Sequence, residues 1–455
     1  MFDDTIAAIA TPLGEGGLAV IRISGATALG VGDKSFVPVG KNSRKPSEAT
    51  SHTIHYGKVV RAGQQVDEVL CAVMLAPRTY TRENVVEITC HGGILSAKTV
   101  LDTVLANGAR LAEPGEFTQR AFLNGRLDLT QAEAVADLIS SRTELALAAA
   151  NEQLAGKLSH RINQLRDDLM NTLAHIEAYI DFPEEDIVPE TKAQLESRLE
   201  GAVAFMDGLL RTANEGQILR RGVRAAIIGR PNAGKSSLLN QLLGHDRAIV
   251  SAIPGTTRDT IEETANVRGL PVVFIDTAGL REARDELELE GIRRSRESLA
   301  RAEFILHVLD ASEPRTDADE KYLAEFAGKK RILVCNKLDL PRKLELPQIP
   351  APVVDVCCVS GQGIEGLKDQ IKALIWAGEI KAEMLQVMIN SRHQDALRRA
   401  REGAALALAA FQADVSLEFV ALDLHVATNA VGEIVGKTAT EDLLDSIFRQ
   451  FCIGK

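Results

Sequence analysis

The residues with the clearest chemistry lie in the middle of the chain, where residues 229–236 read Gly-Arg-Pro-Asn-Ala-Gly-Lys-Ser. This spacing is that of the P-loop, in which backbone N–H groups surround phosphate oxygens. Lys235 can reach the β- and γ-phosphates, and the hydroxyl of Ser236 can ligate Mg²⁺. An apolar run at 223–228 precedes the loop and a helical pattern at 237–243 follows it. The motif therefore has the strand–loop–helix context that it needs, and the helix N-terminus adds to phosphate binding.

A segment that responds to Mg²⁺ and to the γ-phosphate is predicted downstream. Residues 276–279 read Asp-Thr-Ala-Gly and follow an apolar strand pattern. Asp276 can hold Mg²⁺ through water, and the N–H of Gly279 can sense the γ-phosphate. Residues 255–259, which lie between this motif and the P-loop, read Gly-Thr-Thr-Arg-Asp. Thr257 is the candidate switch threonine that closes on Mg²⁺ when the γ-phosphate is present.

A further motif predicts which base is bound. Residues 336–339 read Asn-Lys-Leu-Asp and follow an apolar strand pattern. A carboxylate that faces the base accepts two N–H donors from guanine, whereas adenine presents the wrong pattern, so Asp339 predicts GTP rather than ATP. Residues 357–359 read Cys-Cys-Val, and we expect the backbone N–H of Cys358 to contact the base while the thiols pack. Motifs in this order and context make an accidental P-loop very improbable.

One position departs from the Ras-like pattern. There a glutamine after the Asp-x-x-Gly motif orients the attacking water, but here Leu280 stands at that place and cannot hydrogen-bond water. Another group must take this role. Candidates are the acidic residues that open the next predicted helix, although most of them are expected to be solvated: Asp285, Glu286, Glu288 and Glu290.

Composition and charge limit the broad class. The chain has 455 residues, 45% of them hydrophobic and 25% charged, which predicts a globular protein of about two to four domains. No apolar run is long enough for a membrane span and the N-terminus is acidic, so we expect a cytoplasmic location. The formal charge of −11 argues against a broad nucleic-acid-coating surface but not against a local basic patch. The six cysteines lack CxxC or zinc-finger spacing and are expected to be free thiols.

The first part of the chain is predicted to be an α+β domain over residues 1–118. Alternating, β-branched runs at 18–24, 67–76 and 85–90 read as strands, and glycine and proline clusters separate them. After residue 118 the sequence pattern changes. Apolar residues then recur at helical spacing, and alanine, leucine, glutamate and arginine dominate.

The remaining chain is predicted to hold one domain inserted into another. Residues 119–215 and 378–455 both have helical texture, whereas residues 216–377 alternate apolar strands with helices, as an open α/β sheet does. The simplest arrangement is a discontinuous α-helical domain with the α/β P-loop G domain inserted. Insertion is tolerated where the chain ends of a domain lie close together.

Outside the nucleotide motifs, the chain resembles the MnmE (TrmE) family of tRNA-modification GTPases over its full length. The motifs at 229–236, 255–259 and 276–281 also fit Era- or Der-like GTPases. More specific are Arg-Ile-Ser-Gly at 22–25, His-Gly-Gly at 91–93, Pro-Gly-Glu-Phe at 114–117, Phe-Leu-Asn-Gly-Arg-Leu-Asp-Leu at 122–129 and the terminal Phe-Cys-Ile-Gly-Lys at 451–455.

The resemblance implies that G-domain dimerisation with a monovalent cation, usually K⁺, activates GTP hydrolysis. A cation at the phosphates stabilises transition-state charge as an arginine finger does. Glu288 matches the family's water-orienting glutamate, which acts through a second water and fills the role that Leu280 lacks. The implied metal ligands are Asn232, Ser251, Ile253 and Thr256 for K⁺, and Ser236 and Thr257 for Mg²⁺.

The resemblance also implies that the N-terminal domain forms the dimer and binds folate, as 5-formyl-tetrahydrofolate or a related one-carbon tetrahydrofolate. Arg22, Glu87, Arg126 and Lys455 fall on the folate-contacting positions. An arginine can pair the glutamyl carboxylate, and Glu87 can accept from the N–H edge of the pterin. Cys452 sits beside that site in the family and joins Glu288 as a candidate catalytic residue; a buried inert thiol is the alternative.

The resemblance thus gives a function, which is GTP-driven formation of a 5-carboxymethylaminomethyl group on the wobble uridine of certain tRNAs. The implied partners are a second copy of the chain, the FAD-binding protein MnmG in a heterotetramer, and tRNA, with no membrane. The expected GTP-binding residues are Asn232, Ala233, Gly234, Lys235, Ser236, Ser237, Ser251, Ala252, Ile253, Pro254, Gly255, Thr256, Thr257, Asp276, Thr277, Ala278, Gly279, Asn336, Lys337, Asp339 and Cys358.

Two alternative functions are weighed against this one. An Era- or Der-like switch in ribosome assembly would carry a KH-like RNA module or a second P-loop, and the sequence has neither. A folate-dependent one-carbon transferase would turn over folate without GTP, which leaves the nucleotide motifs unexplained.

Overall fold

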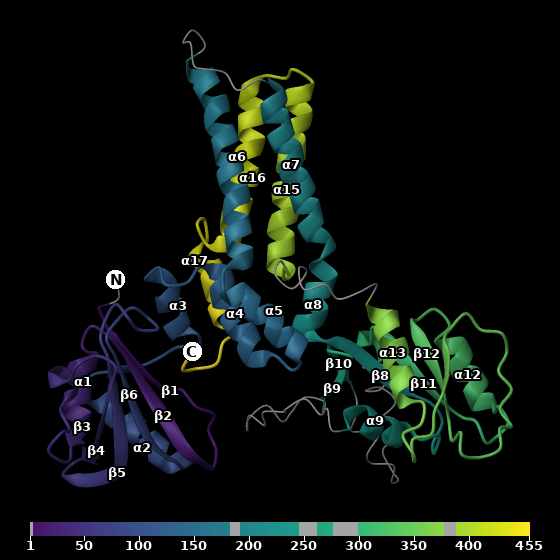
Figure 1. Ribbon diagram of the computed structural model, residues 1–455, viewed down its shortest axis with the longest axis horizontal. Helices are drawn as coiled ribbons and strands as arrows, with labels where there is room; N and C mark the ends of the chain where they lie inside the picture. The colour runs from purple at the N-terminus through teal and green to yellow at the C-terminus, as the bar shows by residue number, and fades with distance from the viewer. Residues whose placement is uncertain (1–2, 183–191, 245–261, 276–298, 377–387) are drawn as a thin grey trace.

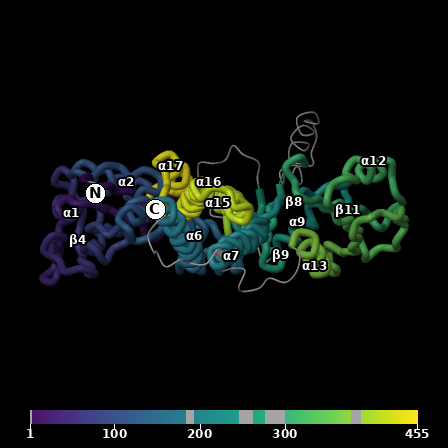
Figure 2. Tube along the Cα trace, turned by 90° about the horizontal axis from the view of Figure 1, so that it is seen from above, coloured from purple at the N-terminus to yellow at the C-terminus, as the bar shows by residue number. Residues whose placement is uncertain are grey.

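The computed structural model describes residues 3–182, 192–244, 262–275, 299–376 and 388–455. A seven-stranded sheet at one end and a six-stranded sheet at the other are separated by a bundle of long helices (Figure 1). From above, these three parts follow one another along the length of the molecule (Figure 2). Within the described ranges, no helix has the length and apolarity that a membrane span requires.

The N-terminal part is a mostly antiparallel sheet with helices packed on it. Its elements are β1 (Thr5–Ile9), β2 (Gly16–Gly25), α1 (Ala28–Ser35), β3 (Phe36–Pro38), a 3₁₀ helix (Pro46–Glu48), β4 (Thr53–Arg61), β5 (Gln64–Met74), β6 (Val85–Gly92), α2 (Ile94–Ala106), β7 (Arg110–Leu111) and α3 (Glu116–Leu123). The strand order is β3-β4-β5-β6-β2-β1-β7, and only the β1–β7 pair is parallel. The predicted strands are confirmed in β2, β5 and β6, although β5 ends two residues earlier than predicted.

The central part consists of helices from two separate stretches of the chain. They are α4 (Leu129–Ser140), α5 (Glu144–Leu154), α6 (Lys157–Asp181), α7 (Lys192–Arg211), α8 (Ala213–Arg221), α15 (Ser391–Gln412), α16 (Leu417–Val435) and α17 (Glu441–Phe448). Helices α15 and α16 pack against α7 and α6, and one apolar cluster that includes Leu169, Leu199 and Leu424 joins them (Figure 1). The discontinuous helical domain is therefore confirmed, whereas its boundaries stay predictions, because α8 runs across residues 215 and 216.

The inserted part is an open α/β sheet. Its elements are β8 (Val223–Ile228), α9 (Lys235–Leu243), β9 (Glu263–Val267), β10 (Leu270–Phe274), β11 (Phe304–Asp310), α12 (Asp317–Glu325), β12 (Arg331–Asn336), β13 (Val353–Asp355) and α13 (Ile364–Ile375). The order is β13-β12-β11-β8-β10-β9, with all pairs parallel except β10–β9. The carboxyl ends of β8, β11 and β12 meet at one edge, where open α/β sheets bind their ligands.

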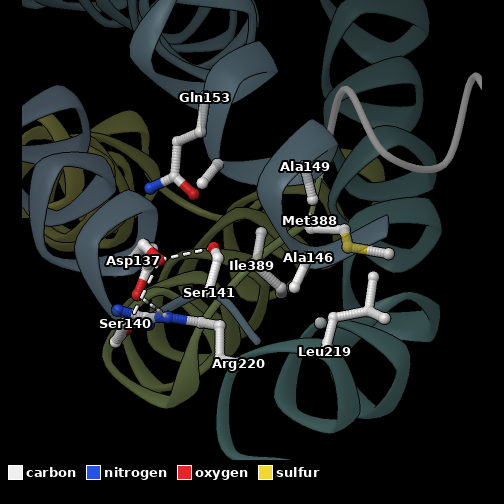
Figure 3. Close-up of a pocket in the computed structure, with 12 residues that line it drawn as sticks. Asp137, Ser140, Ser141, Ala146, Ala149, Gln153, Leu219, Arg220, Met388 and Ile389 are labelled. Atoms are coloured by element: carbon white, nitrogen blue, oxygen red, sulfur yellow. Dashed lines mark hydrogen bonds and ion pairs between the residues drawn. The ribbon is translucent and has the colours of Figure 1, made fainter. Parts of the chain in front are cut away.

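Helix α8 connects the bundle to the inserted sheet. Arg220 Nε donates a 2.7 Å hydrogen bond to Asp137 Oδ1 on α4, and Figure 3 shows this pair beside apolar residues that include Leu219. The pocket between them is only about 20 Å³, about the space of one water. Trp376, the only tryptophan in the chain, is buried in the same junction with Leu219 and Leu270. The connection between bundle and sheet is therefore closely packed.

Candidate functional site

The P-loop joins β8 to α9 in a shape that needs its two glycines. Gly229 has φ +144°, and a Cβ there would overlap the carbonyl of Val308. Gly234 has φ +98°, and a Cβ there would overlap the amide of Asn336. Asn232 also has a positive φ, 61°, which asparagine tolerates better than most residues. The shape of the loop therefore requires glycine at positions 229 and 234, where any other residue would clash.

Lys235 lies within the loop that it is predicted to serve. Its Nζ donates hydrogen bonds of 2.8 Å to the carbonyls of Gly229 and Arg230, so the ammonium group is held over the loop. Burial lowers the pKa of Lys235. A phosphate in the loop would restore the favourable environment of this half-buried charge.

The base-reading segment is attached directly to the P-loop. Asn336 Nδ2 donates to the carbonyl of Ala233 at 2.9 Å, and its Oδ1 accepts the N–H of Cys358 at 3.1 Å. One amide thereby connects three of the predicted nucleotide-binding segments. The structure brings these segments together at the carboxyl edge of the sheet.

Asp339 has a partner that sequence reasoning missed. The thiol of Cys357 donates to Asp339 Oδ1 at 3.2 Å, so this cysteine orients the carboxylate that is predicted to read guanine. The sequence gives a signal, since Cys357 immediately precedes Cys358 in the base-loop triad. The thiol was expected only to pack.

Ion pairs to Asp310 hold the segment at 336–339 and the P-loop against the end of β11. Lys337 Nζ lies 2.5 Å from Asp310 Oδ2, at the end of β11. Arg230 also reaches Asp310, at 3.6 Å, and pairs with Glu313 at 2.6 Å. Burial alone would raise the pKa of Asp310, but hydrogen bonds from Lys337 and Ser312 hold it below its usual range. The carboxylate therefore stays ionised and keeps both cations in place.

The remaining predicted nucleotide and metal residues cannot be placed. These residues, which lie outside the described ranges, are Ser251, Ala252, Ile253, Pro254, Gly255, Thr256, Thr257, Asp276, Thr277, Ala278, Gly279 and Glu288. Ser236 and Ser237 begin α9 next to Lys235, where a Mg²⁺ ligand would stand. No group of three or more metal-ligating side chains occurs in the part of the chain that was described.

A second cluster lies on the N-terminal sheet, far from the P-loop (Figure 1). Arg22 on β2 stands opposite Glu87 on β6, and their side chains form a 2.7 Å ion pair. Arg22 Nη1 also donates to the carbonyl of Gly454 at 3.2 Å, which brings the C-terminus to the sheet. Strand register and the chain end therefore unite three segments that are distant in sequence.

Tyr80 is a residue of this cluster that sequence reasoning missed. The guanidinium of Arg126 lies 4.7 Å from the centre of its ring, and that of Arg22 lies 6.0 Å away. Arg126 Nη1 also donates to the Tyr80 carbonyl at 3.2 Å. Burial raises the pKa of the Tyr80 hydroxyl, which hydrogen-bonds Thr118. No motif spacing marks a single tyrosine in a loop, so only the fold could reveal it.

The C-terminal residues are fixed against the N-terminal domain by backbone hydrogen bonds. The N–H of Gly115 donates to the carbonyl of Cys452, and that of Phe117 donates to the carbonyl of Lys455. Burial and the charge of Arg22 lower the pKa of Lys455, although Glu87 and Cys452 oppose this shift. Cys452 is exposed, so it is not a buried thiol, whereas its reactivity stays a prediction. All predicted folate residues and Cys452 therefore gather around Arg22 and Tyr80.

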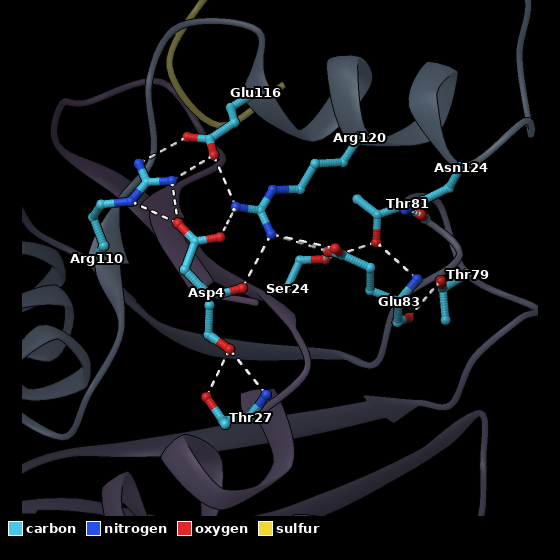
Figure 4. A network of polar contacts seen from close by, with 11 residues as sticks. Asp4, Ser24, Thr27, Thr79, Thr81, Glu83, Arg110, Glu116, Arg120 and Asn124 are labelled. Carbon is cyan, nitrogen blue, oxygen red and sulfur yellow. Dashed lines mark hydrogen bonds and ion pairs between the residues drawn. The ribbon is translucent and has the colours of Figure 1, made fainter. Parts of the chain in front are cut away.

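The buried Arg120 stabilises the loop that carries Tyr80. Arg120 is fully buried and reaches Asp4 Oδ1 at 2.7 Å, Glu116 Oε1 at 2.9 Å and Glu83 Oε1 at 3.2 Å (Figure 4). Burial alone would raise the pKa of Glu116, but hydrogen bonds from Arg110 and the N–H of Glu113, and then from Arg120, lower it. The network joins the start of β1, the loop that carries Tyr80, and α3. It holds in place the backbone from which Tyr80 projects.

Comparisons with known proteins show the family of the chain. Residues 5–126 match the family model described as GTP-binding protein TrmE N-terminus, and residues 129–452 match the MnmE helical domain. The chain is 49% identical to the tRNA modification GTPase MnmE of Geobacillus kaustophilus, and 48% identical to that of Listeria innocua, over 99% of each chain. The G domain of the T. maritima FeoB iron transporter aligns with 33% of this chain and 98% of its own length at 26% identity, with a TM-score of only 0.26.

The length of these matches decides the family. They cover the N-terminal sheet, the helical bundle and the inserted sheet together, so they are not matches to a P-loop domain alone. The P-loop motifs alone also fit Era- or Der-like GTPases, but the full-length match is to MnmE relatives, so this alternative loses its support. The chain belongs to the MnmE family of tRNA modification GTPases.

Proposed function

We propose that this chain hydrolyses GTP to drive tRNA modification, the activity for which its relatives are named. The observation that carries the nucleotide part is the hydrogen bond between Asn336 and Ala233, because it joins the base-reading loop to the P-loop. Asp339 then selects guanine through the two N–H donors of that base. Mg²⁺ and K⁺ are the proposed ions, and they would neutralise charge that develops on the phosphates.

The residues present fit those ions as far as they are described. Asn232 is exposed at the outer turn of the P-loop and, at its positive φ, is proposed to ligate K⁺. Ser236, at the start of α9, is proposed to ligate Mg²⁺ together with Thr257. Glu288 is proposed to orient the attacking water, and Ser251, Ile253 and Thr256 to complete the K⁺ site.

The N-terminal cluster is proposed to bind a one-carbon tetrahydrofolate. The fit rests on Arg22, Arg126 and Lys455, three cationic groups for the glutamyl carboxylates, and on the Glu87 carboxylate for the pterin N–H groups. A bound folate supplies the one-carbon unit. The exposed Cys452 influences the charge of Lys455 electrostatically, and a catalytic role for Cys452 is part of this proposal.

The finer assignment follows from family membership. We propose that the product is the 5-carboxymethylaminomethyl group on the wobble uridine of certain tRNAs, made in the cytoplasm. The protein would act as a homodimer through its N-terminal domains, in a heterotetramer with FAD-binding MnmG. G-domain closure would couple hydrolysis to the modification.

Two experiments test these statements. Nucleoside mass spectrometry of tRNA from cells that lack this chain should show loss of the modified wobble uridine, and an unchanged profile would overturn the function. GTP hydrolysis should be much faster in KCl than in NaCl, and Asn232→Ala should abolish that difference. Equal rates of the unaltered protein in both salts would refute the cation-activated mechanism while leaving the tRNA result to stand separately.

A further inference from the structure

A pocket of about 480 Å³ lies at the edge of the inserted sheet opposite the P-loop. Since β8, β11 and β12 are parallel, their amino ends meet there, whereas their carboxyl ends carry the nucleotide site. The end of α8 forms the other wall, because this helix leads directly into β8 (Figure 1). None of the described residues that line the pocket belongs to the nucleotide or folate clusters, so neither cluster explains it.

Cations dominate the charged lining. They come from four places, the end of α8, the start of β8, and the residues just before β11 and β12: Arg221, Arg224, Arg301 and Lys330. Glu303 is the only acid among the described lining residues, and its Oε2 accepts the backbone N–H of Arg224 at 2.9 Å. The described lining therefore carries four cations and one acid, on a chain whose formal charge is −11.

These cations are available to a ligand. All four residues are exposed, and among the described residues Arg221 donates only to the hydroxyl of Ser391, at 2.9 Å. No ion pair within the described ranges engages Arg224, Arg301 or Lys330. Like charges gathered at one pocket repel one another, and an anion relieves that repulsion. Asn214 and Gln217 add amide groups that can donate to the same anion.

We propose that this pocket binds the phosphate backbone of RNA, which for this protein is the tRNA substrate. Phosphodiester oxygens are acceptors that arginine, lysine and amide donors contact without reading sequence. A local site of this kind explains how a chain of net negative charge engages a polyanion. The choice of tRNA rests on the proposed function, whereas the phosphate chemistry rests on the pocket alone.

The position of the pocket gives such binding a consequence. Arg221 lies at the end of α8 and Arg224 lies in β8 of the inserted sheet. One segment of RNA backbone that contacts both residues would therefore bridge α8 and the G domain. Ile375 lines the pocket, and the next residue is Trp376, which is buried in the junction. Bound RNA would thus change the surroundings of Trp376 at the connection between the two domains. The fluorescence of this single tryptophan can therefore measure RNA binding.

The test compares tRNA binding by the full chain and by two double variants. Arg224→Gln with Lys330→Gln removes two pocket cations, and Arg315→Gln with Lys321→Gln removes the same charge from the exposed region at the start of α12. At low salt, the pocket variant should bind an unmodified tRNA transcript about tenfold more weakly. The slope of log affinity against log salt should fall by about 1.5 to 2. Basal GTP hydrolysis should be unchanged in both variants, which shows that they are folded.

Trp376 fluorescence separates the sources of phosphate. Titration with tRNA should change the emission of the unaltered protein and of the control variant but not of the pocket variant. If inorganic phosphate gives this change and tRNA does not, the pocket holds a free anion and the RNA assignment is wrong. Equal tRNA affinity in the pocket and control variants would overturn the proposal, as would no binding of tRNA at all. Mass spectrometry of the wobble uridine tests the proposed function separately, whatever these binding measurements give.

Discussion

Asn336 donates a 2.9 Å hydrogen bond to the carbonyl of Ala233 while its other amide atom accepts the N–H of Cys358. The loop predicted to read the base, the P-loop and the loop after β13 are therefore joined by one side chain. We therefore expect guanine recognition and phosphate binding to be coupled through this single side chain. A substitution at Asn336 should consequently weaken binding of the phosphates as well as binding of the base.

Asn336→Ala should weaken GTP binding by about 30-fold, because two net hydrogen bonds of roughly 1 kcal/mol each are lost and a buried N–H is left unpaired. A fluorescent guanine nucleotide titrated into each variant measures the effect. Asn266→Ala is the matched control, since Asn266 accepts the N–H of Gly269 in a turn of the same domain. Affinity that falls equally in both variants would show general loosening of the domain instead of the specific link.

Cys357→Ala should weaken GTP binding about threefold to tenfold, because the Asp339 carboxylate loses its oriented donor. Cys357→Ser should restore the affinity, as a hydroxyl donates to a carboxylate at least as well as a thiol does. The adjacent Cys358→Ala serves as control, since Cys358 engages Asn336 through its backbone N–H. An alanine variant at Cys357 with normal affinity would show that Asp339 is positioned without the thiol.

Much of this arrangement could be predicted from local sequence. The strand at Val223–Ile228, the helix after the P-loop and the discontinuous helical domain follow from periodicity and glycine spacing, which act over short distances. The contact of Arg22 with Gly454 could not be derived from spacing, because it joins residues 432 positions apart. Tyr80 was missed for the same reason: its importance depends on which cations the fold brings to its ring.

Tyr80→Ala should weaken 5-formyl-tetrahydrofolate binding about tenfold, because Arg126 and Arg22 lose the ring that orients their guanidinium groups. Tyr80→Phe keeps the ring and should bind nearly normally. Tyr56→Ala, on β4 of the same sheet and away from this cluster, is the control for loss of an aromatic residue. Isothermal titration calorimetry measures each affinity, and equal binding by the alanine and phenylalanine variants at Tyr80 would contradict the role of the ring.

The inserted sheet should lose stability in mild acid because of His307 on β11. The side chain is fully buried, neither ring nitrogen has a hydrogen-bond partner among the described residues, and Tyr322 meets it edge-on at 6.1 Å. Burial, and then the charge of Arg331, lower the pKa of His307 from 6.5 to about 4, against the opposing influence of Asp319. The unfolded chain therefore binds this proton at a higher pH than the folded domain does.

The sign and size of the effect follow from that difference. Stability from His307 is complete above pH 6.5 and is lost as the pH falls toward 4, up to on the order of 3 kcal/mol. His307→Leu should fill the same apolar site without titrating, so its melting temperature, measured by scanning fluorimetry from pH 8 to 5, should fall less than that of the unaltered protein. His160→Leu at an exposed position of α6 should leave the pH profile unchanged. If His307→Leu follows the unaltered profile throughout, other groups cause the acid sensitivity, since the proton on this ring is the one difference that the substitution removes from the folding equilibrium.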